Sequence, residues 1–151
     1  MPTLAINKKA AYDYELTEHF SAGLVLTGPE TKAIKLGQAS LKGAFVVLKQ
    51  IGKAWPEAYL LNCLVTPYKF SIREEQNPTR SRKLLLNRAE LLRIGSKTVE
   101  KGLTLVPLKL YTAKGRVKLD FAIGRGKKKQ DKRADIKKKD IERELKRRLK
   151  G

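Results

Sequence analysis

The feature that most constrains the fold of this chain is a change of composition at Gly124. Residues 1–123 have 20 basic and 10 acidic side chains and contain almost all of the large apolar residues. Residues 124–151 have 14 basic and 5 acidic side chains, no aromatic residue and few large aliphatic ones. A hydrophobic core must therefore come from the first part. We predict one domain over residues 1–123 and a basic C-terminal tail over residues 124–151.

The apolar runs of residues 1–123 are short and lie between residues that favour turns. They alternate with period two or are rich in β-branched and aromatic side chains, which indicates strands. We predict strands over residues 11–16, 23–27, 44–48, 55–65, 103–111 and 116–123. Many short strands with no alternation of strand and helix favour a mainly β fold, a small closed antiparallel β-barrel of the OB-like type.

Two helix starts interrupt the strands. Thr27 and Glu30 have the spacing of a capping box, and Gly37 is a ready C-terminal stop. Asn87 and Glu90 repeat the same spacing before a second short helix. We therefore expect short helices that flank the barrel.

The tail has the spacing of a helix but little apolar surface. Ile141, Leu145 and Leu149 recur every four residues, and Glu144 stands four residues before Arg148, which favours a helix. A thin apolar stripe among many like charges makes an isolated helix marginal. We predict a tail that is largely disordered when free and becomes helical on a polyanion.

The chain offers little chemistry for catalysis or for a cofactor. His19 and Cys63 are its only histidine and cysteine, so a disulfide or a zinc site of these ligands is not available, and a reducing cytoplasm is expected. The longest nearly apolar run, residues 58–65, is too short to span a membrane. We expect a cytoplasmic protein that is not an enzyme and needs no cofactor or metal. One alternative stays open, a nuclease with a carboxylate-bound metal, if the fold gathers Asp13, Glu15, Glu30 and Asp120.

The formal net charge of +19 indicates a polyanionic partner, because cationic surfaces attract nucleic acids. A membrane surface is a weaker alternative, since the tail has no aromatic anchor. Arg80, Arg82 and Lys83 lie in a polar basic loop, and arginine binds phosphate in a bidentate manner. For Arg80 a structural ion pair is the competing interpretation.

Several ordered motifs resemble one known family. They include Asn7-Lys8-Lys9-Ala10, Ala22-Gly23-Leu24-Val25-Leu26, Pro78-Thr79-Arg80-Ser81-Arg82-Lys83-Leu84-Leu85-Leu86, Lys101-Gly102-Leu103-Thr104-Leu105-Val106-Pro107-Leu108-Lys109-Leu110-Tyr111 and Gly126-Lys127-Lys128 followed by Asp131-Lys132-Arg133. Together they cover essentially the whole chain. The sequence resembles the small protein B family, the SsrA-binding proteins, which are partners of transfer-messenger RNA in bacteria.

The resemblance implies an RNA-binding adaptor. Its β-barrel is expected to bind the tRNA-like domain of transfer-messenger RNA and to deliver that RNA to stalled ribosomes for trans-translation. Its tail is expected to enter the decoding centre and the empty messenger channel of the small subunit as a helix. A monomer is expected. The alternative is an OB-like structural or ribosome-associated protein that binds RNA with little selectivity.

The resemblance also assigns residues to two sites. The expected RNA site on the barrel comprises Asn7, Ser21, Leu85 and Lys118, to which the charge pattern adds Arg80, Arg82 and Lys83. The expected ribosome site in the tail comprises Arg125, Lys127, Lys128, Gln130, Asp131, Lys132, Arg133 and Ile141. Ser21 stands where the family usually has an acid, and Gln130 stands where it usually has a tyrosine or histidine.

Overall fold

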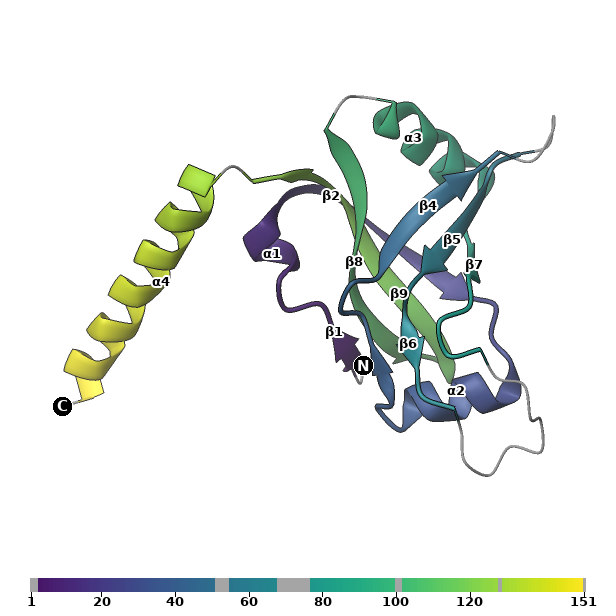
Figure 1. Ribbon diagram of the computed structural model, residues 1–151, viewed down its shortest axis with the longest axis horizontal. Helices are drawn as coiled ribbons and strands as arrows, with labels where there is room; N and C mark the ends of the chain where they lie inside the picture. The colour runs from purple at the N-terminus through teal and green to yellow at the C-terminus, as the bar shows by residue number, and fades with distance from the viewer. Residues whose placement is uncertain (1–2, 51–54, 68–76, 100–101, 128, 151) are drawn as a thin grey trace.

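The strands of the main sheet pair around a ring (Figure 1). The computed structural model describes residues 3–50, 55–67, 77–99, 102–127 and 129–150. Six strands follow one another in the order β8-β4-β5-β7-β2-β9, and the pairing of β8 with β9 completes the ring. All of these pairings are antiparallel. The strands are β2 (Tyr14–Leu24), β4 (Phe45–Lys49), β5 (Glu57–Leu61), β7 (Arg82–Leu85), β8 (Leu103–Ala113) and β9 (Arg116–Gly126). The mainly β prediction is confirmed.

Among the described residues, three more short strands lie beside the ring. β1 (Thr3–Ile6) pairs with the outer edge of β8, and β3 (Ala39–Ser40) pairs with β6 (Leu64–Val65) in a separate small sheet. β3 and β7 had no counterpart among the predicted strands; Arg82 and Lys83 of β7 were expected in a basic loop. β1 had no counterpart either. Its short run of residues gives no clear period, so only its pairing with β8 identifies it as a strand.

Capping boxes start the two helices that border the ring, α2 (Gly28–Lys35) and α3 (Arg88–Thr98), as the sequence predicts. The Glu30 N–H donates to Thr27 Oγ1 over 3.3 Å, and the Thr27 N–H donates to Glu30 Oε1 over 2.9 Å. Asn87 and Glu90 form the equivalent pair of hydrogen bonds in α3. Gly37 has a φ of +79° just after α2, the left-handed conformation that ends many helices.

The core fills the inside of the ring. Alternate side chains of β2 and β9 point inward, and Phe20 stacks on Phe121 with ring centroids 5.6 Å apart. Leu60, Leu110 and Leu119 are fully buried among them. An alternation of apolar inner and polar outer residues leaves the outer face of the same strands free for polar and charged groups.

Three strand predictions were wrong in detail. The one over residues 23–27 is only the end of β2, which stops at Leu24. Residues 11–16 are not one strand, because the single turn α1 (Ala10–Asp13) comes first and β2 then runs without a break from Tyr14 to Leu24. An alternation over so few residues also fits a helical turn. The run 55–65 splits into β5 and β6 at Asn62, whose φ of +56° turns the chain. The hairpin of β8 and β9 is confirmed, with its turn at Lys114 and Gly115.

The tail begins later than the change of composition. β9 continues through Gly126, and α4 (Lys129–Lys150) follows and extends away from the ring near α1 (Figure 1). Every side chain of α4 that the structure describes is exposed. The disorder expected for the free tail stays a prediction. None of the described helices has the length and apolarity that crossing a bilayer requires.

Candidate nucleic-acid interface

Four neighbouring strands align one row of residues on the outer face of the ring. Leu85 of β7 is opposite Gly23 of β2, Gly23 is opposite Lys118 of β9, and Lys118 is opposite Tyr111 of β8. Residues that are directly opposite on paired strands point to the same face. Leu85 is 55% exposed, and an atom added as a Cβ at Gly23 would lie 3.5 Å from Leu85 Cδ1. The row therefore combines an exposed apolar side chain, a lysine and an aromatic ring.

A second row lies two residues further along β2 and β9. Ser21 is opposite Asp120, and Asp120 is opposite Lys109 of β8. Ser21 Oγ and the Tyr111 hydroxyl share a short hydrogen bond, which joins the two rows. Lys109 Nζ lies 3.7 Å from Asp120 Oδ2 and 5.5 Å from the centroid of the Tyr111 ring.

Asn7 lies at the end of this surface, just after β1. Its Nδ2 donates a hydrogen bond to the Pro107 carbonyl oxygen over 2.8 Å, and its backbone N–H donates to the Leu108 carbonyl oxygen over 2.8 Å. Ile6, the residue before it, is opposite Lys109. Asn7 thus holds the end of β1 against β8, next to the second row. We call this surface the outer RNA face, after the partner that the sequence predicts for it; it comprises Asn7, Ser21, Gly23, Leu85, Lys109, Tyr111, Lys118 and Asp120.

The structure separates Arg82 from that face. The side chain of Arg82 is 1% exposed, and its Nε donates to Glu30 Oε2 over 2.8 Å. Its Nη1 donates to the Cys63 carbonyl oxygen over 2.8 Å, and its Nη2 donates to the Pro78 carbonyl oxygen over 3.2 Å. The expectation that Arg82 contacts RNA is corrected here, because a guanidinium buried and bonded in this way is not accessible to a phosphate.

Arg80 shares the same carboxylate. Arg80 Nε donates to Glu30 Oε2 over 2.9 Å, and its side chain is 33% exposed. The competing interpretation of Arg80 as a structural ion pair is therefore the one that the geometry supports. We call Glu30, Arg80 and Arg82 the Glu30 cluster; it joins α2 to the segment that leads into β7.

The carboxyl group of Glu30 is held in its ionised form by the cluster. Burial by itself raises the pKa of Glu30, but hydrogen bonds from Arg80 and from the Thr27 backbone, with the charge of Arg82, more than reverse this effect. The net result lowers the pKa of Glu30 from 4.5 to about 2. The carboxylate is thus charged at neutral pH and balances the two guanidinium groups.

Lys83 lies on the outside of β7, two residues before Leu85. Its Nζ is 3.3 Å from Glu57 Oε1, and its side chain is 43% exposed. Hydrogen bonds from the Tyr59 hydroxyl and from Lys83, of which the first has the larger effect, hold the pKa of Glu57 below its ordinary value of 4.5. Lys83 is thus a neighbour of the outer RNA face with an exposed acidic partner of its own.

The tail residues expected to contact the ribosome start at the end of the ring. Arg125 is exposed in β9, opposite Glu15 and Leu103, and the Lys127 N–H donates to the Asp13 carbonyl oxygen over 2.9 Å. Arg133 and Ile141 are exposed on α4. Lys128 and the side chains of Gln130, Asp131 and Lys132 lie outside those that the structure describes.

A cluster of side chains that could hold a metal ion is absent from the described ranges. The described residues contain no group of three or more His, Cys, Asp or Glu side chains placed to hold a metal ion. Glu30 is bonded to two arginines, whereas Asp120 lies on the outer RNA face, so the fold does not gather the carboxylates that a nuclease would need. Burial raises the pKa of the Cys63 thiol to about 11, which keeps it protonated at neutral pH.

Sequence reasoning missed Gly23, Lys109 and Asp120 as members of the outer face. Each was present in the sequence, but only the strand register makes them neighbours of Ser21 and Lys118. The one available signal was alternation in β9, where Lys118 and Asp120 are two residues apart and must share a face.

The chain is similar to proteins of one family. The model of the family described as "SmpB protein" matches residues 4–151. The SsrA-binding protein of Sulfurihydrogenibium sp. is 44% identical over 148 residues, 98% of this chain and 94% of the relative. That of Syntrophotalea carbinolica is 48% identical over 146 residues, 97% of this chain and 94% of the relative. A solved structure described as "tmRNA-SmpB: a journey to the center of the bacterial ribosome" has 38% identity and a TM-score of 0.64, covering 82% of this chain and 84% of that chain.

Proposed function

Because the chain belongs to the SmpB protein family, we propose that it is an RNA-binding adaptor of trans-translation. It binds the tRNA-like domain of transfer-messenger RNA and delivers this RNA to stalled ribosomes. Its relatives are SsrA-binding proteins by name, and the similar solved structure concerns tmRNA, SmpB and the bacterial ribosome. The single observation that favours this function most is the match of the family over residues 4–151.

We propose the outer RNA face as the site for the tRNA-like domain. Lys118 supplies a cation for a phosphate, and Leu85 with Tyr111 supplies apolar and aromatic surface for sugars and bases. Ser21 and Asp120 supply groups that accept hydrogen bonds, which suits the hydroxyl and amino groups of RNA. Asn7 supports this face through its hydrogen bond to Pro107.

We propose that the tail, which follows the end of β9 at Gly126, binds the ribosome and that the ring binds the carried RNA. The exposed cations of α4, such as Arg133, suit an RNA surface, and Ile141 and Leu145, four residues apart on one face of the helix, give it an exposed apolar stripe. In this proposal the ribosome site also includes Arg125 at the end of β9, with Lys127, Lys128, Gln130, Asp131 and Lys132. The protein acts in the cytoplasm as a monomer, without catalysis, metal or cofactor.

The test compares two RNAs at one fixed salt concentration, because phosphate binding depends steeply on ionic strength. The full chain is titrated with a fragment that contains the tRNA-like domain and with an unrelated hairpin of equal length. We expect the fragment to bind at least about tenfold more tightly, as specific contacts add to the charge term. Equal affinities would favour the alternative of a non-selective RNA-binding protein.

A further inference from the structure

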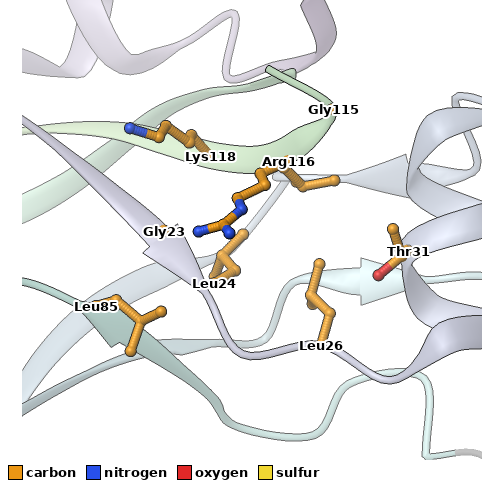
Figure 2. A pocket seen from close by; sticks show the side chains of 9 residues that line it. Gly23, Leu24, Leu26, Thr31, Leu85, Gly115, Arg116 and Lys118 are labelled. Carbon is orange, nitrogen blue, oxygen red and sulfur yellow. The ribbon is translucent and has the colours of Figure 1, made fainter. Parts of the chain in front are cut away.

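A pocket of about 490 Å³ opens beside the outer RNA face, between the end of β2, the start of β9 and α2 (Figure 2). Gly23, Leu85 and Lys118 line it and also belong to the first row of the face. Its size is within the range of about 300–1,000 Å³ of pockets that hold small ligands or single chemical groups. The pocket is therefore continuous with the surface proposed to bind RNA.

The floor of the pocket is apolar. Leu24 and Leu26 are half-buried and Leu85 is exposed, so their side chains offer carbon surface to an occupant. Gly23 has no side chain, which leaves the floor open next to Leu85. A flat apolar or aromatic group fits this surface better than a hydrated ion does.

Two cations border this floor. Figure 2 shows the guanidinium of Arg116 reaching from β9 toward Gly23 and Leu24. The ammonium of Lys118, further along β9, points in the opposite direction. Within the described ranges, neither Arg116 nor Lys118 has a hydrogen-bond or ion-pair partner among the acidic residues. Their charges are thus available for an anionic occupant.

The third type of group in the pocket is the Thr31 hydroxyl. It donates its proton to the Thr27 carbonyl oxygen over 3.0 Å, so its oxygen remains an acceptor. An acceptor beside an apolar floor matches a planar group with an N–H donor on its edge.

We infer that this pocket holds one unstacked base of the bound RNA, with Arg116 stacked over the base and Lys118 at its phosphate. The inference rests on the proposed function, since the base belongs to the RNA on the adjacent face. Bases that are flipped out of RNA loops stack on guanidinium planes and use their edges for hydrogen bonds. An apolar floor, a planar cation above it, an edge acceptor and a second cation together match a nucleotide.

The test combines protein variants with RNA variants. Each loop nucleotide of the tRNA-like fragment is replaced in turn by an abasic one, and each RNA is titrated against the full chain and against Arg116→Ala. We expect one abasic position to weaken binding about tenfold with the unchanged protein, the size of one base–side-chain stacking contact. The same position has no further effect with Arg116→Ala, because the stacking partner is already absent. If no position is coupled to Arg116 in this way, the inference is wrong.

Arg116→Lys is the matched control, because it retains the charge and removes the plane. We expect it to behave like Arg116→Ala at the coupled position; full restoration of coupling by lysine would show charge attraction alone and overturn the stacking assignment. Gly23→Ala is a second variant, whose added methyl reaches only ordinary contact distance to Leu85. Gly23→Ala should lower the affinity for the intact RNA more than the affinity for the abasic RNA. An equal loss of affinity for both RNAs would contradict the inference.

Two other results are distinguishable. In the first, a polyglutamate peptide competes with the RNA, and peptide binding depends on Arg116 and Leu26 as strongly as RNA binding does. This result would indicate a peptide site and overturn the inference. Failure of the proposed function has another signature, since the unchanged protein would then bind the tRNA-like fragment no better than an unrelated hairpin. If only the base pocket is absent, the preference for the tRNA-like fragment remains, and only the coupling between Arg116 and one nucleotide is lost.

Discussion

The ring and the tail have nearly the same excess of positive charge but hold their cations in different ways. In the ring, Arg80 and Arg82 are bonded to the buried carboxylate of Glu30. In the tail, the ion pair that the structure describes joins Arg148 to Glu144 over 3.7 Å, and both side chains are more than two-thirds exposed. Part of the ring's charge is therefore structural, whereas the tail's described charge faces solvent.

The two regions also differ in what stabilises them. Residues such as Phe121 and Leu119 are fully buried inside the ring. Ile136, Ile141 and Leu145 of α4 are 45%, 57% and 54% exposed. The ring thus has a core of its own, whereas the apolar side chains of α4 are exposed, and in our proposal a partner covers them.

The largest expected effect concerns the Glu30 cluster. Glu30→Gln removes the charge that balances buried Arg82, which should lower the free energy of unfolding by about 3 kcal/mol or more. The matched change in the tail, Glu144→Gln, breaks an exposed i,i+4 pair and should cost less than about 0.5 kcal/mol. Urea unfolding of the full chain measures both. Similar losses in the two variants would contradict the distinction between structural and solvent-facing charge.

The same cluster predicts how stability depends on pH. The pKa of Glu30 is lowered from 4.5 to about 2 on folding, so its contribution is complete above pH 4.5 and is lost as the pH falls toward 2. We expect the stability advantage of the unchanged protein over Glu30→Gln to shrink by about 3 kcal/mol across that window. Unfolding curves of both proteins at several pH values test this prediction. A difference that stays constant would mean that Glu30 is not held ionised.

The next-largest effect distinguishes a lysine of the outer RNA face from the other exposed cations of the ring. Lys118→Ala should reduce affinity for the tRNA-like fragment about tenfold and lower the slope of log affinity against log salt by about 1. Lys97→Ala is the control, because Lys97 is exposed in the last turn of α3 and lies beside Thr17 and Leu103, which do not belong to the outer RNA face. Titrations at three salt concentrations measure the slope. Equal slopes for the two variants would remove Lys118 from the site.

The smallest expected signal is the helix content of the tail. The circular dichroism of the full chain minus that of a chain ending at Lys127 gives the contribution of α4 (Lys129–Lys150). Without RNA we expect less than about half of the full helical signal, because like charges and a thin apolar stripe make the isolated helix marginal. Added polyanion should raise it. A complete helix that does not respond to polyanion would contradict a tail ordered by its partner.

The parts of the fold that the sequence predicts well are local ones. The capping boxes at Thr27 and Asn87 and the hairpin of β8 and β9 depend on residues a few positions apart. The wrong strand at 11–16 and the missed β1 have short runs of residues whose state is decided by distant pairing partners.

The candidate site was only partly predictable for the same reason. Ser21 and Lys118 came from a resemblance, but Tyr111 became their neighbour through the register of three strands. The basic loop predicted three exposed cations. Strand alternation instead turned Arg82 inward, to a Glu30 that is 52 residues away in the sequence, and left Lys83 outside. A count of charges in the sequence does not distinguish the buried Arg82 from the exposed Lys83.

One measurement tests the division of roles most directly. A chain that ends at Lys127 keeps all of β9 and the hydrogen bond from Lys127 to Asp13, so the ring should fold unchanged. We predict that it binds the tRNA-like fragment within about threefold of the full chain, because the phosphate contacts of the ring remain. We also predict that it no longer supports transfer of alanine from transfer-messenger RNA on stalled ribosomes. Loss of binding to the fragment, or full activity on the ribosome, would contradict separate sites in the ring and the tail.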